Sequence, residues 1–292
     1  MRRPPTHGRD SGHDPVPNWH TRRPVPTTSG RASLVGVLLV LATAALVMLH
    51  GLALATGGSA ATRTLAAILP ALTDLDQALQ VHGEAVRVAA SDDGFVPVPG
   101  LPLPVAVPAQ AAQTGGEALR HEAIAAMTRA VYRSGSGALQ AEEAVARSTT
   151  PLTRSWLLDQ ALNLLTRTMH AHLALWRVPA VAAVTILAAL LAMTTGWRRA
   201  SVAVGSAVAA GALFATVVAA LGWGAVLVLL SGSGDVTEAV LGRVTRDVAM
   251  MVIGTGLIVA VAATLMAAVG TLPRGDGRAA SANLASPRLD GQ

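Results

Sequence analysis

The stretch that decides the fold is WRVPAVAAVTILAALLAMTTGWRR, residues 176–199. Its middle is uniformly apolar, and each end carries a tryptophan followed by arginine. About 20 apolar residues in a helix span the hydrocarbon core of a bilayer, which is about 30 Å thick. Tryptophan favours the two membrane–water interfaces, where its ring has both an apolar and a polar neighbour. The segment therefore predicts a membrane helix rather than the buried core helix of a soluble domain.

Three further segments share this composition. The four predicted spans cover residues 33–57, 178–197, 200–230 and 248–270, and none of them contains Asp, Glu, Lys or Arg. One charged side chain at the centre of a span would cost about 2.5–3.5 kcal/mol on insertion scales. The predicted fold class is therefore all-α: a polytopic membrane protein with four transmembrane helices.

The composition excludes several kinds of chemistry. Only 13% of the residues are charged, against about 25% in soluble domains. All 22 basic residues are arginine, so no lysine is present to form a Schiff base. Cysteine is absent, which excludes disulfides, thiolate catalysis and Cys-ligated metals. Arginine without lysine, together with abundant Ala, Val and Gly, is typical of a GC-rich bacterial genome.

The distribution of arginine predicts the orientation. Segments 1–32, 198–199 and 274–292 together hold 11 Arg and 4 acidic residues, whereas 58–177 and 231–247 together hold 11 Arg and 13 acidic residues. Basic residues near the ends of spans accumulate on the cytoplasmic side. We therefore expect a multi-pass protein of the plasma (cell) membrane with both termini in the cytoplasm.

The segments outside the spans follow from this orientation. We expect 58–177 to be a helical extracytoplasmic domain between the first and second spans, and 231–247 to be an extracytoplasmic loop. The basic tail 1–32 and the tail 271–292 are expected to be disordered and cytoplasmic. The basic tail is also suited to lie on anionic lipid.

Two spans leave alternatives open. The first could be a signal peptide cleaved at Ala53-Leu54-Ala55, but its apolar run of about 20 residues favours an uncleaved anchor. The third is about 45 Å long as a helix, so it must tilt, project or break. A break at Gly222-Trp223-Gly224 would line a substrate site. The favoured interpretation is that Trp223 marks the outer interface and the helix projects.

Small and hydroxylic residues recur within the spans. Rows of small residues at four-residue spacing, which let helices approach closely, are Ser201, Gly205 and Ala209, then Ala207 and Gly211, then Gly256 and Ala260. The hydroxyls expected to bond back to their own helices are those of Thr185, Thr194, Ser206, Thr216, Thr255 and Thr264. No buried acid or base accompanies them, which argues against an ion-coupled transporter.

The first half of the outer domain is divided by proline. Residues 60–90 are expected to be helical, with a kink at Pro70. The alternation of proline with Val and Leu over 97–108 predicts an extended or polyproline conformation. The favoured interpretation is a connector that packs Phe95, Val105 and Val107 onto the helices, and the alternative is a docking ligand for an aromatic groove.

A second helical segment follows over 114–134. Thr114 and Glu117 have the spacing of a capping box, and Gly135 is expected to end the helix. Its apolar face is Leu119, Ala123, Met127, Ala130 and Val131. A shorter helix is expected over 138–147.

The end of the outer domain predicts one long helix from Thr153 through Trp197, bent near Pro179. Apolar residues recur in it at intervals of four and three, as in a coiled coil: Leu158, Leu162, Leu165, Met169, His172 and Trp176. Such a stalk would hold the domain close to the membrane; the alternative is that it transmits movement across the bilayer.

Motifs of known chemistry are missing from the sequence. His170 and His172 lie two residues apart and would point to different faces of a helix, so a structural role is favoured over a metal site. Asp92-Asp93 is interpreted as a turn, with a calcium contact as the alternative. The Ser-Gly-Ser-Gly stretches at 134–137 and 231–234 are interpreted as loops without a nucleophile elbow. Arg274-Gly275-Asp276 is expected inside, so it predicts no adhesion. No catalytic, cofactor-binding or metal-binding residue is predicted, and no nucleic-acid partner.

The proline run at 97–108, followed by the helix at 114–134, resembles the outer loop of four-span bacterial membrane proteins. This resemblance implies a layout and no activity. The sequence favours a non-enzymatic accessory, interaction or signalling protein, whose partners are the lipid bilayer and a protein bound through 58–177. A transport or lipid-handling component is the alternative. A membrane enzyme is a third hypothesis, for which the histidines at 170 and 172 would be examined first.

Overall fold

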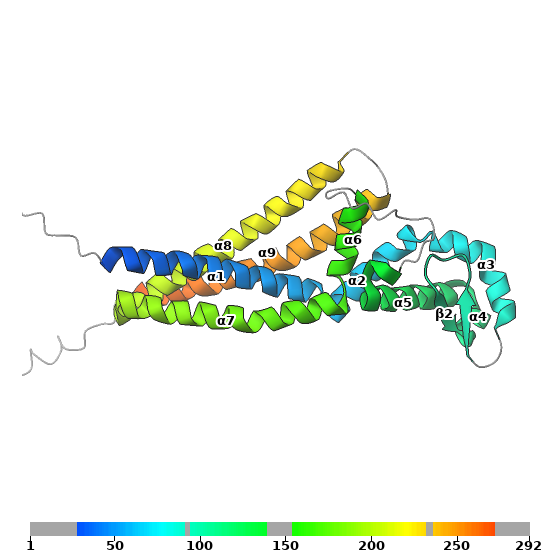
Figure 1. Cartoon of the computed structure of the whole chain (residues 1–292), viewed down its shortest axis with the longest axis horizontal. Helices are drawn as coiled ribbons and strands as arrows, with labels where there is room; N and C mark the ends of the chain where they lie inside the picture. Colours follow the sequence, from blue (N-terminus) through cyan, green and yellow to red (C-terminus); the bar gives the residue numbers. More distant parts are fainter. Residues whose placement is uncertain (1–27, 91–93, 139–153, 232–235, 272–292) are drawn as a thin grey trace, which may run out of the picture.

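The structure, a computed structural model, describes residues 28–90, 94–138, 154–231 and 236–271. Its helices that are long and apolar enough to cross a membrane are α1 (Thr28–Ala55), α7 (Arg167–Thr195), α8 (Trp197–Leu230) and α9 (Val236–Thr271). They form a bundle, and a smaller, mostly helical body stands at one end of it (Figure 1). The prediction of four helices of membrane-spanning length is confirmed, and the chain has the character of a multi-pass membrane protein.

Helix α1 is the centre of the bundle. It contacts α7, α8 and α9, and the side chains of Leu39, Thr43, Ala44 and Val47 on it are buried. Helix α8 likewise contacts the other three long helices, so α1 and α8 together join the bundle.

Glycines that the sequence singled out lie where helices cross. A Cβ on Gly205 would stand 2.7 Å from the carbonyl oxygen of Ala263 in α9, and one on Gly211 would stand 2.5 Å from that of Val40 in α1. Gly256 of α9 lies in similarly close contact with α8. No real side chain fits these spaces, so the backbones approach because a Cβ is missing.

The six hydroxyl groups that the sequence singled out are satisfied locally, as predicted, whereas the buried hydroxyl of Thr43 in α1 has no hydrogen-bond partner among the described residues. Each of the six donates to a carbonyl of its own helix over 2.8–3.1 Å: Thr185, Thr194, Ser206, Thr216, Thr255 and Thr264. These six therefore need no partner from a neighbouring helix and mark no polar path through the bundle.

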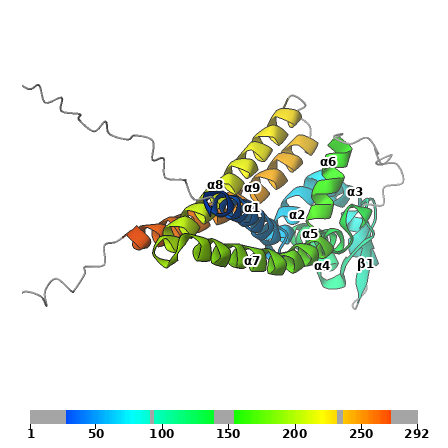
Figure 2. The same ribbon diagram turned by 60° about the vertical axis from the view of Figure 1, so that its left-hand side comes forward.

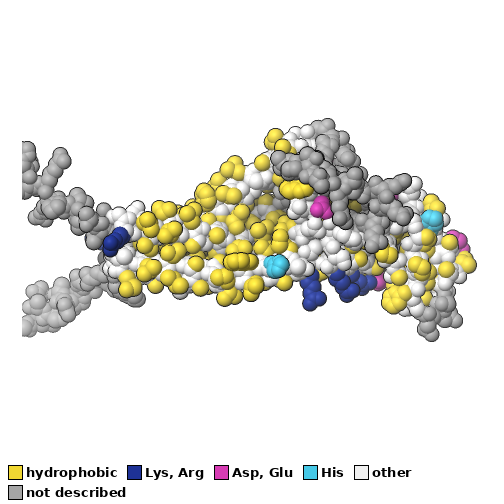
Figure 3. All heavy atoms as spheres, in the orientation of Figure 1, with side chains coloured by type: hydrophobic (Ala, Val, Ile, Leu, Met, Phe, Trp, Pro, Cys, Tyr) yellow, Lys and Arg dark blue, Asp and Glu magenta, His cyan; other side chains and the backbone are white. Residues whose placement is uncertain are grey.

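The apolar lengths of α1 and α7 match. With 1.5 Å per residue, Arg31 and His50 lie about 28 Å apart along α1, and Arg177 and Thr195 lie about 27 Å apart along α7. His50 and Arg177 contact each other, with 2.5 Å between Nδ1 and Nη2, so the two helices are in register. Figure 3 shows hydrophobic side chains covering this length of the bundle, with charged side chains and histidine beyond it.

Helix α8 is longer than a bilayer requires. It runs at an angle to α1 (Figures 1 and 2), which shortens its projection as a tilt would. It continues without interruption through Gly222, Trp223 and Gly224, so the candidate break is wrong. In an apolar surrounding a break would leave backbone N–H and C=O groups unpaired, and that cost exceeds the weak helix propensity of two glycines.

The smaller body is made of short elements. They are α2 (Gly58–Leu72), α3 (Leu75–Ala89), β1 (Phe95–Val98), β2 (Val105–Pro108), α4 (Ala109–Thr114), α5 (Gly116–Ser134), the 3-10 turn η1 (Gly135–Ala138) and α6 (Arg154–Leu164). We call this body the helical domain. One hydrophobic core unites it, with Leu65, Met127 and Leu165 among its fully buried members.

Helix α9 belongs to both bodies. Val240 and Val244, one turn apart near its start, are buried in the core of the helical domain, while its later turns pack on α8. The expected loop over 231–247 is therefore helical from Val236 onward. The apolar residues at four-residue spacing give this segment a helical face that the domain covers.

The predicted continuous helix from Thr153 through Trp197 is wrong. Helix α6 ends at Leu164 and α7 begins at Arg167, because the Thr166 hydroxyl accepts a hydrogen bond from the N–H of Met169 and caps α7. The apolar seam ends at this break: Leu162 and Leu165 are buried in the domain, whereas Trp176 is 64% exposed. Pro179, by contrast, lies within α7 without breaking it.

The structure differs from three other local predictions. The segment 60–90 contains two helices, because Thr73 and the left-handed Asp74 (φ 45°) separate α2 from α3. Thr114 ends α4 and donates to the carbonyl of Gln110, so it forms no capping box. The proline run is extended, as predicted, but folds into an antiparallel hairpin.

The apolar face predicted for the helix at 114–134 is confirmed, because its residues are buried or partly buried. Leu119, Ala123, Met127 and Val131 are fully buried and Ala130 is partly buried. Gly135 ends α5 with φ 65°, as expected. The helix predicted over 138–147 lies outside the described residues beyond Ala138.

Substitution of the crossing glycines tests the bundle. We expect Gly211→Val to lower stability by about 1–3 kcal/mol, because the new side chain would overlap the backbone of α1. Gly222→Ala is the matched control on the same helix: nothing lies within 4 Å of its Cβ position, so we expect no loss. The thermal unfolding midpoint in detergent measures both, and equal midpoints for the two variants would contradict the crossing.

Candidate functional site

The two histidines of the His-x-His pair do not converge. His170 Nδ1 lies 3.1 Å from the carbonyl oxygen of Ala53 and 3.3 Å from the Thr56 hydroxyl, both at the end of α1. His172 is exposed on the same helix. His170 therefore ties the start of α7 to the end of α1, and the pair offers no shared ligand position.

The junction between the bundle and the helical domain is held by pairwise polar contacts. The Thr64 hydroxyl in α2 donates to the Asp247 carboxylate in α9 over 3.1 Å. Arg177 of α7 meets His50 of α1; because arginine only donates, the His50 Nδ1 atom accepts. In the part of the chain that the structure describes, no three His, Asp or Glu side chains gather as a metal site would require.

The Ser-Gly-Ser-Gly stretch at 134–137 forms the end of α5 and part of η1 rather than a loop. The Ser136 N–H and hydroxyl both donate to the Asn163 side-chain oxygen over 3.2 Å, which joins this turn to α6. Three other motifs lie outside the described residues: Asp92-Asp93, most of the stretch at 231–234, and Arg274-Gly275-Asp276.

The end of the helical domain furthest from the bundle carries exposed apolar side chains. On α3, Val81 and Val88 are 67% and 77% exposed, although they lie seven residues apart and so share one face. The ion pair between Glu84 and Arg87 borders this face (2.6 Å). It also lowers the pKa of Glu84, through the hydrogen bond and then the charge of Arg87.

The hairpin is apolar on both of its faces. Val96, Val98, Val105 and Val107 point into the core and are buried. The outward positions are also apolar: Phe95, 72% exposed, then Pro97, Ala106 and the half-buried Pro108. A hairpin with one face on the core normally alternates with polar residues on the other. We call the exposed residues Val81, Val88, Phe95, Pro97 and Ala106 the distal surface.

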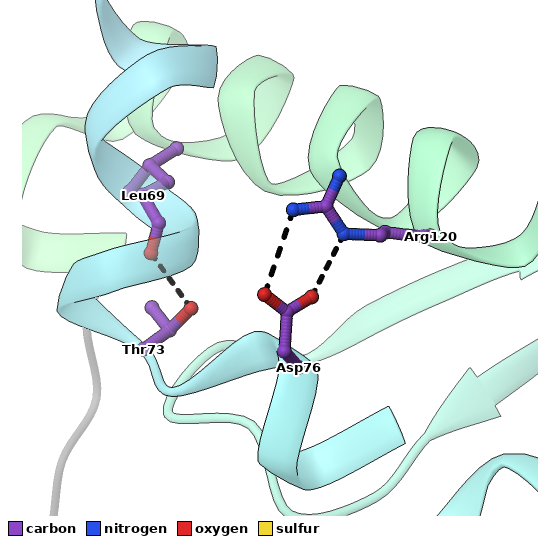
Figure 4. A network of polar contacts seen from close by, with 4 residues as sticks. All are labelled: Leu69, Thr73, Asp76 and Arg120. Carbon is purple, nitrogen blue, oxygen red and sulfur yellow. Dashed lines mark hydrogen bonds and ion pairs between the residues drawn. The ribbon is translucent and has the colours of Figure 1, made fainter. Parts of the chain in front are cut away.

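Specific contacts hold the elements of the distal surface together. At the start of α3, Arg120 of α5 pairs with Asp76 over 2.8 Å, and the Thr73 hydroxyl closes α2 by donating to the Leu69 carbonyl over 2.8 Å (Figure 4). Further along α3, the ring of His82 packs on Gly100 in the hairpin loop. Gly100 has φ 79° and no room for a Cβ, so the loop approaches α3 only with glycine there.

The distal surface differs from the sequence prediction, which placed Phe95 in the core. Val105 and Val107 are buried as predicted, but Phe95 is not. The alternation of FVPV, residues 95–98, shows that Phe95 and Pro97 point away from Val96 and Val98. It does not show which of the two faces is buried, because both are apolar.

No known protein family, curated protein or solved structure matches the chain.

The pH dependence of stability tests the pair that holds α3. The hydrogen bond from Arg120 lowers the pKa of Asp76 below its ordinary value, so the pair stabilises the fold above that ordinary pKa of about 4. Its contribution is lost as the pH falls through the lowered value. We expect Asp76→Asn to lower the thermal midpoint slightly at pH 7, as for an exposed pair.

The same difference should shrink as the pH falls below about 4 and through the lowered pKa of Asp76, because the wild-type carboxyl then becomes protonated as well. Glu84→Gln is the matched control, because its partner Arg87 lies on the same helix and joins no second element. A difference for Asp76→Asn that stays constant from pH 7 to the acid range would contradict the role of the pair.

Proposed function

We propose that the chain is a non-enzymatic membrane protein that displays the helical domain outside the membrane and binds a partner protein through the distal surface. The observation that carries the proposal is the hairpin with two apolar faces. One face packs on the core of the domain, and nothing in this chain's described residues covers the other.

The outward face has the chemistry of an interface rather than of a solvated surface. The chain has only two phenylalanines, and one of them stands on this face. Full burial of such a side chain contributes about 1.5–3 kcal/mol, and aromatic residues are enriched at the centres of interfaces. Prolines at 97 and 108 remove backbone donors from the strands, which disfavours addition of a further strand. The partner is therefore expected to pack on side chains.

The proposed orientation places both termini in the cytoplasm and the helical domain outside the plasma membrane. Arg31 and Arg199 stand at the end of the bundle where the termini leave. The segments on the domain side carry more acidic than basic residues. Both features follow the rule that basic residues accumulate inside.

A photo-crosslinker at the distal surface tests the binding function. We expect p-benzoylphenylalanine at position 95 to give one discrete adduct with another protein in intact membranes, because the side chain would lie inside the interface. The same group at position 129, an exposed site on α5, is the matched control and should give none. Mass spectrometry of the excised adduct identifies the partner.

A charge on the same surface should weaken that adduct. We expect Val88→Asp to reduce its yield about tenfold or more, since a buried unpaired charge is strongly unfavourable in an interface. Adducts with lipid alone, adducts with a second copy of this chain, or equal yields from positions 95 and 129 would each overturn the proposed function.

Cysteine labelling tests the orientation. The chain contains no cysteine, so a single introduced thiol is the only target. We expect a membrane-impermeant maleimide added to intact cells to label Arg129→Cys in the helical domain and not Ser281→Cys near the C-terminus. Both should react after lysis, and labelling of position 281 in intact cells would reverse the orientation.

A further inference from the structure

The bundle contains an apolar groove that the binding function does not use. It lies between α1, α7 and α8, near the end of the bundle that holds the start of α1. Its volume is about 470 Å³. Its lining consists of Ala32, Ser33, Gly36, Val37, Val40, Leu191, Thr195, Ala203, Ser206, Ala207 and Ala210. None of these side chains is charged, and the groove is open along one side.

The groove exists because the facing side chains are small. Gly36 of α1 and Ala203, Ala207 and Ala210 of α8 leave space that leucine or valine would fill. The hydroxyls of Thr195 and Ser206 are occupied by carbonyls of their own helices. An apolar hollow of this kind lacks dispersion contacts on one side, and a hydrocarbon chain would restore them.

The guanidinium group of Arg199 is positioned near one end of the groove. Arg199 lies four residues before Ala203, so it is on the groove face of α8 one turn nearer the end of the bundle. Its side chain is exposed. Arginine binds phosphate through paired N–H donors, and basic residues between membrane helices on the cytoplasmic side are suited to anionic lipid headgroups.

The start of α8 adds a second attraction for an anion. Helix α8 begins at Trp197, and its capping residue Gly196 supplies no side-chain acceptor for the first N–H groups. The N-terminus of a helix 34 residues long carries a partial positive charge. Arg199 and the first turn of α8 therefore favour a phosphate at the same end of the groove.

We propose that this groove binds one acyl chain of an anionic phospholipid, whose phosphate lies against Arg199 and the first turn of α8. The acyl chain would lie between α1, α7 and α8, in the bilayer leaflet nearer the two termini. The proposal rests on the bundle alone and is independent of the distal surface.

Native mass spectrometry of the full-length protein in detergent tests this site with two lipid probes, phosphatidylglycerol and phosphatidylcholine. We expect one phosphatidylglycerol to bind more tightly than phosphatidylcholine. Arg199→Gln should weaken phosphatidylglycerol binding about five- to tenfold and leave phosphatidylcholine unchanged. Arg31→Gln is the matched control: Arg31 lies on the side of α1 away from the groove, so we expect less than a twofold change.

A second pair of variants tests the hydrophobic part. Ala210→Leu places bulk at an exposed position in the lining, so the fold should tolerate it while binding of both lipids falls. Ala220→Leu, exposed on the same helix outside the groove, should change neither. Thermal midpoints close to wild type establish that the variants are folded.

Several results would overturn the proposal. They are equal effects of Arg199→Gln and Arg31→Gln, equal binding of the two lipids, or phosphatidylglycerol binding that Ala210→Leu does not reduce. A second copy of the chain held at the groove in place of lipid would also overturn it. None of these results would bear on crosslinking at position 95, so failure of this site and failure of the proposed function are distinguishable.

Discussion

The close approach of α1 to its neighbours is the contact on which the rest of the structure depends. Gly211 brings α8 onto the backbone of Val40, and Gly51 brings α1 onto Val252 of α9. In a bilayer, helix packing gains little from the hydrophobic effect, because lipid tails are as apolar as leucine. Dispersion between close backbones must supply the stability, and it decays steeply with distance. A Cβ at Gly211 would therefore weaken the packing of α8 on α1, and one at Gly51 the packing of α1 on α9.

The position of α1 also determines how the helical domain is held. Only Thr56 and Gly57 separate α1 from α2, and His170 of α7 bonds to the end of α1 at that turn. Helix α9 enters the domain from the other side and gives Val240 and Val244 to its core. The domain is thus attached through several elements. These attachments replace the single continuous stalk predicted from the sequence, because α6 and α7 are separated at Thr166.

The features predicted best from the sequence are those that depend on local composition. A span is recognised from about 20 consecutive apolar residues, and a hydroxyl in an apolar helix has its own carbonyl as the nearest acceptor. Prediction failed where two local signals competed. The apolar periodicity from Leu158 to Trp176 indicated one helix, but the Thr166 cap ended it. Thr114 had the spacing of a capping box, but the two glycines that follow it take positive φ values and start a new helix instead.

The distal surface was unpredictable for a different reason. Alternation places Phe95 and Val96 on opposite faces but cannot say which face meets the core, since both are apolar. The tertiary contacts decide: the four valines of the hairpin enter the core of the helical domain, and Phe95 stays outside. A sequence selected only for stability would put polar residues on the outer face, which costs nothing in the core. The apolar outer face supports the proposed binding function, in which a platform held by Asp76, Arg120 and Gly100 would lose little conformational entropy when a partner binds.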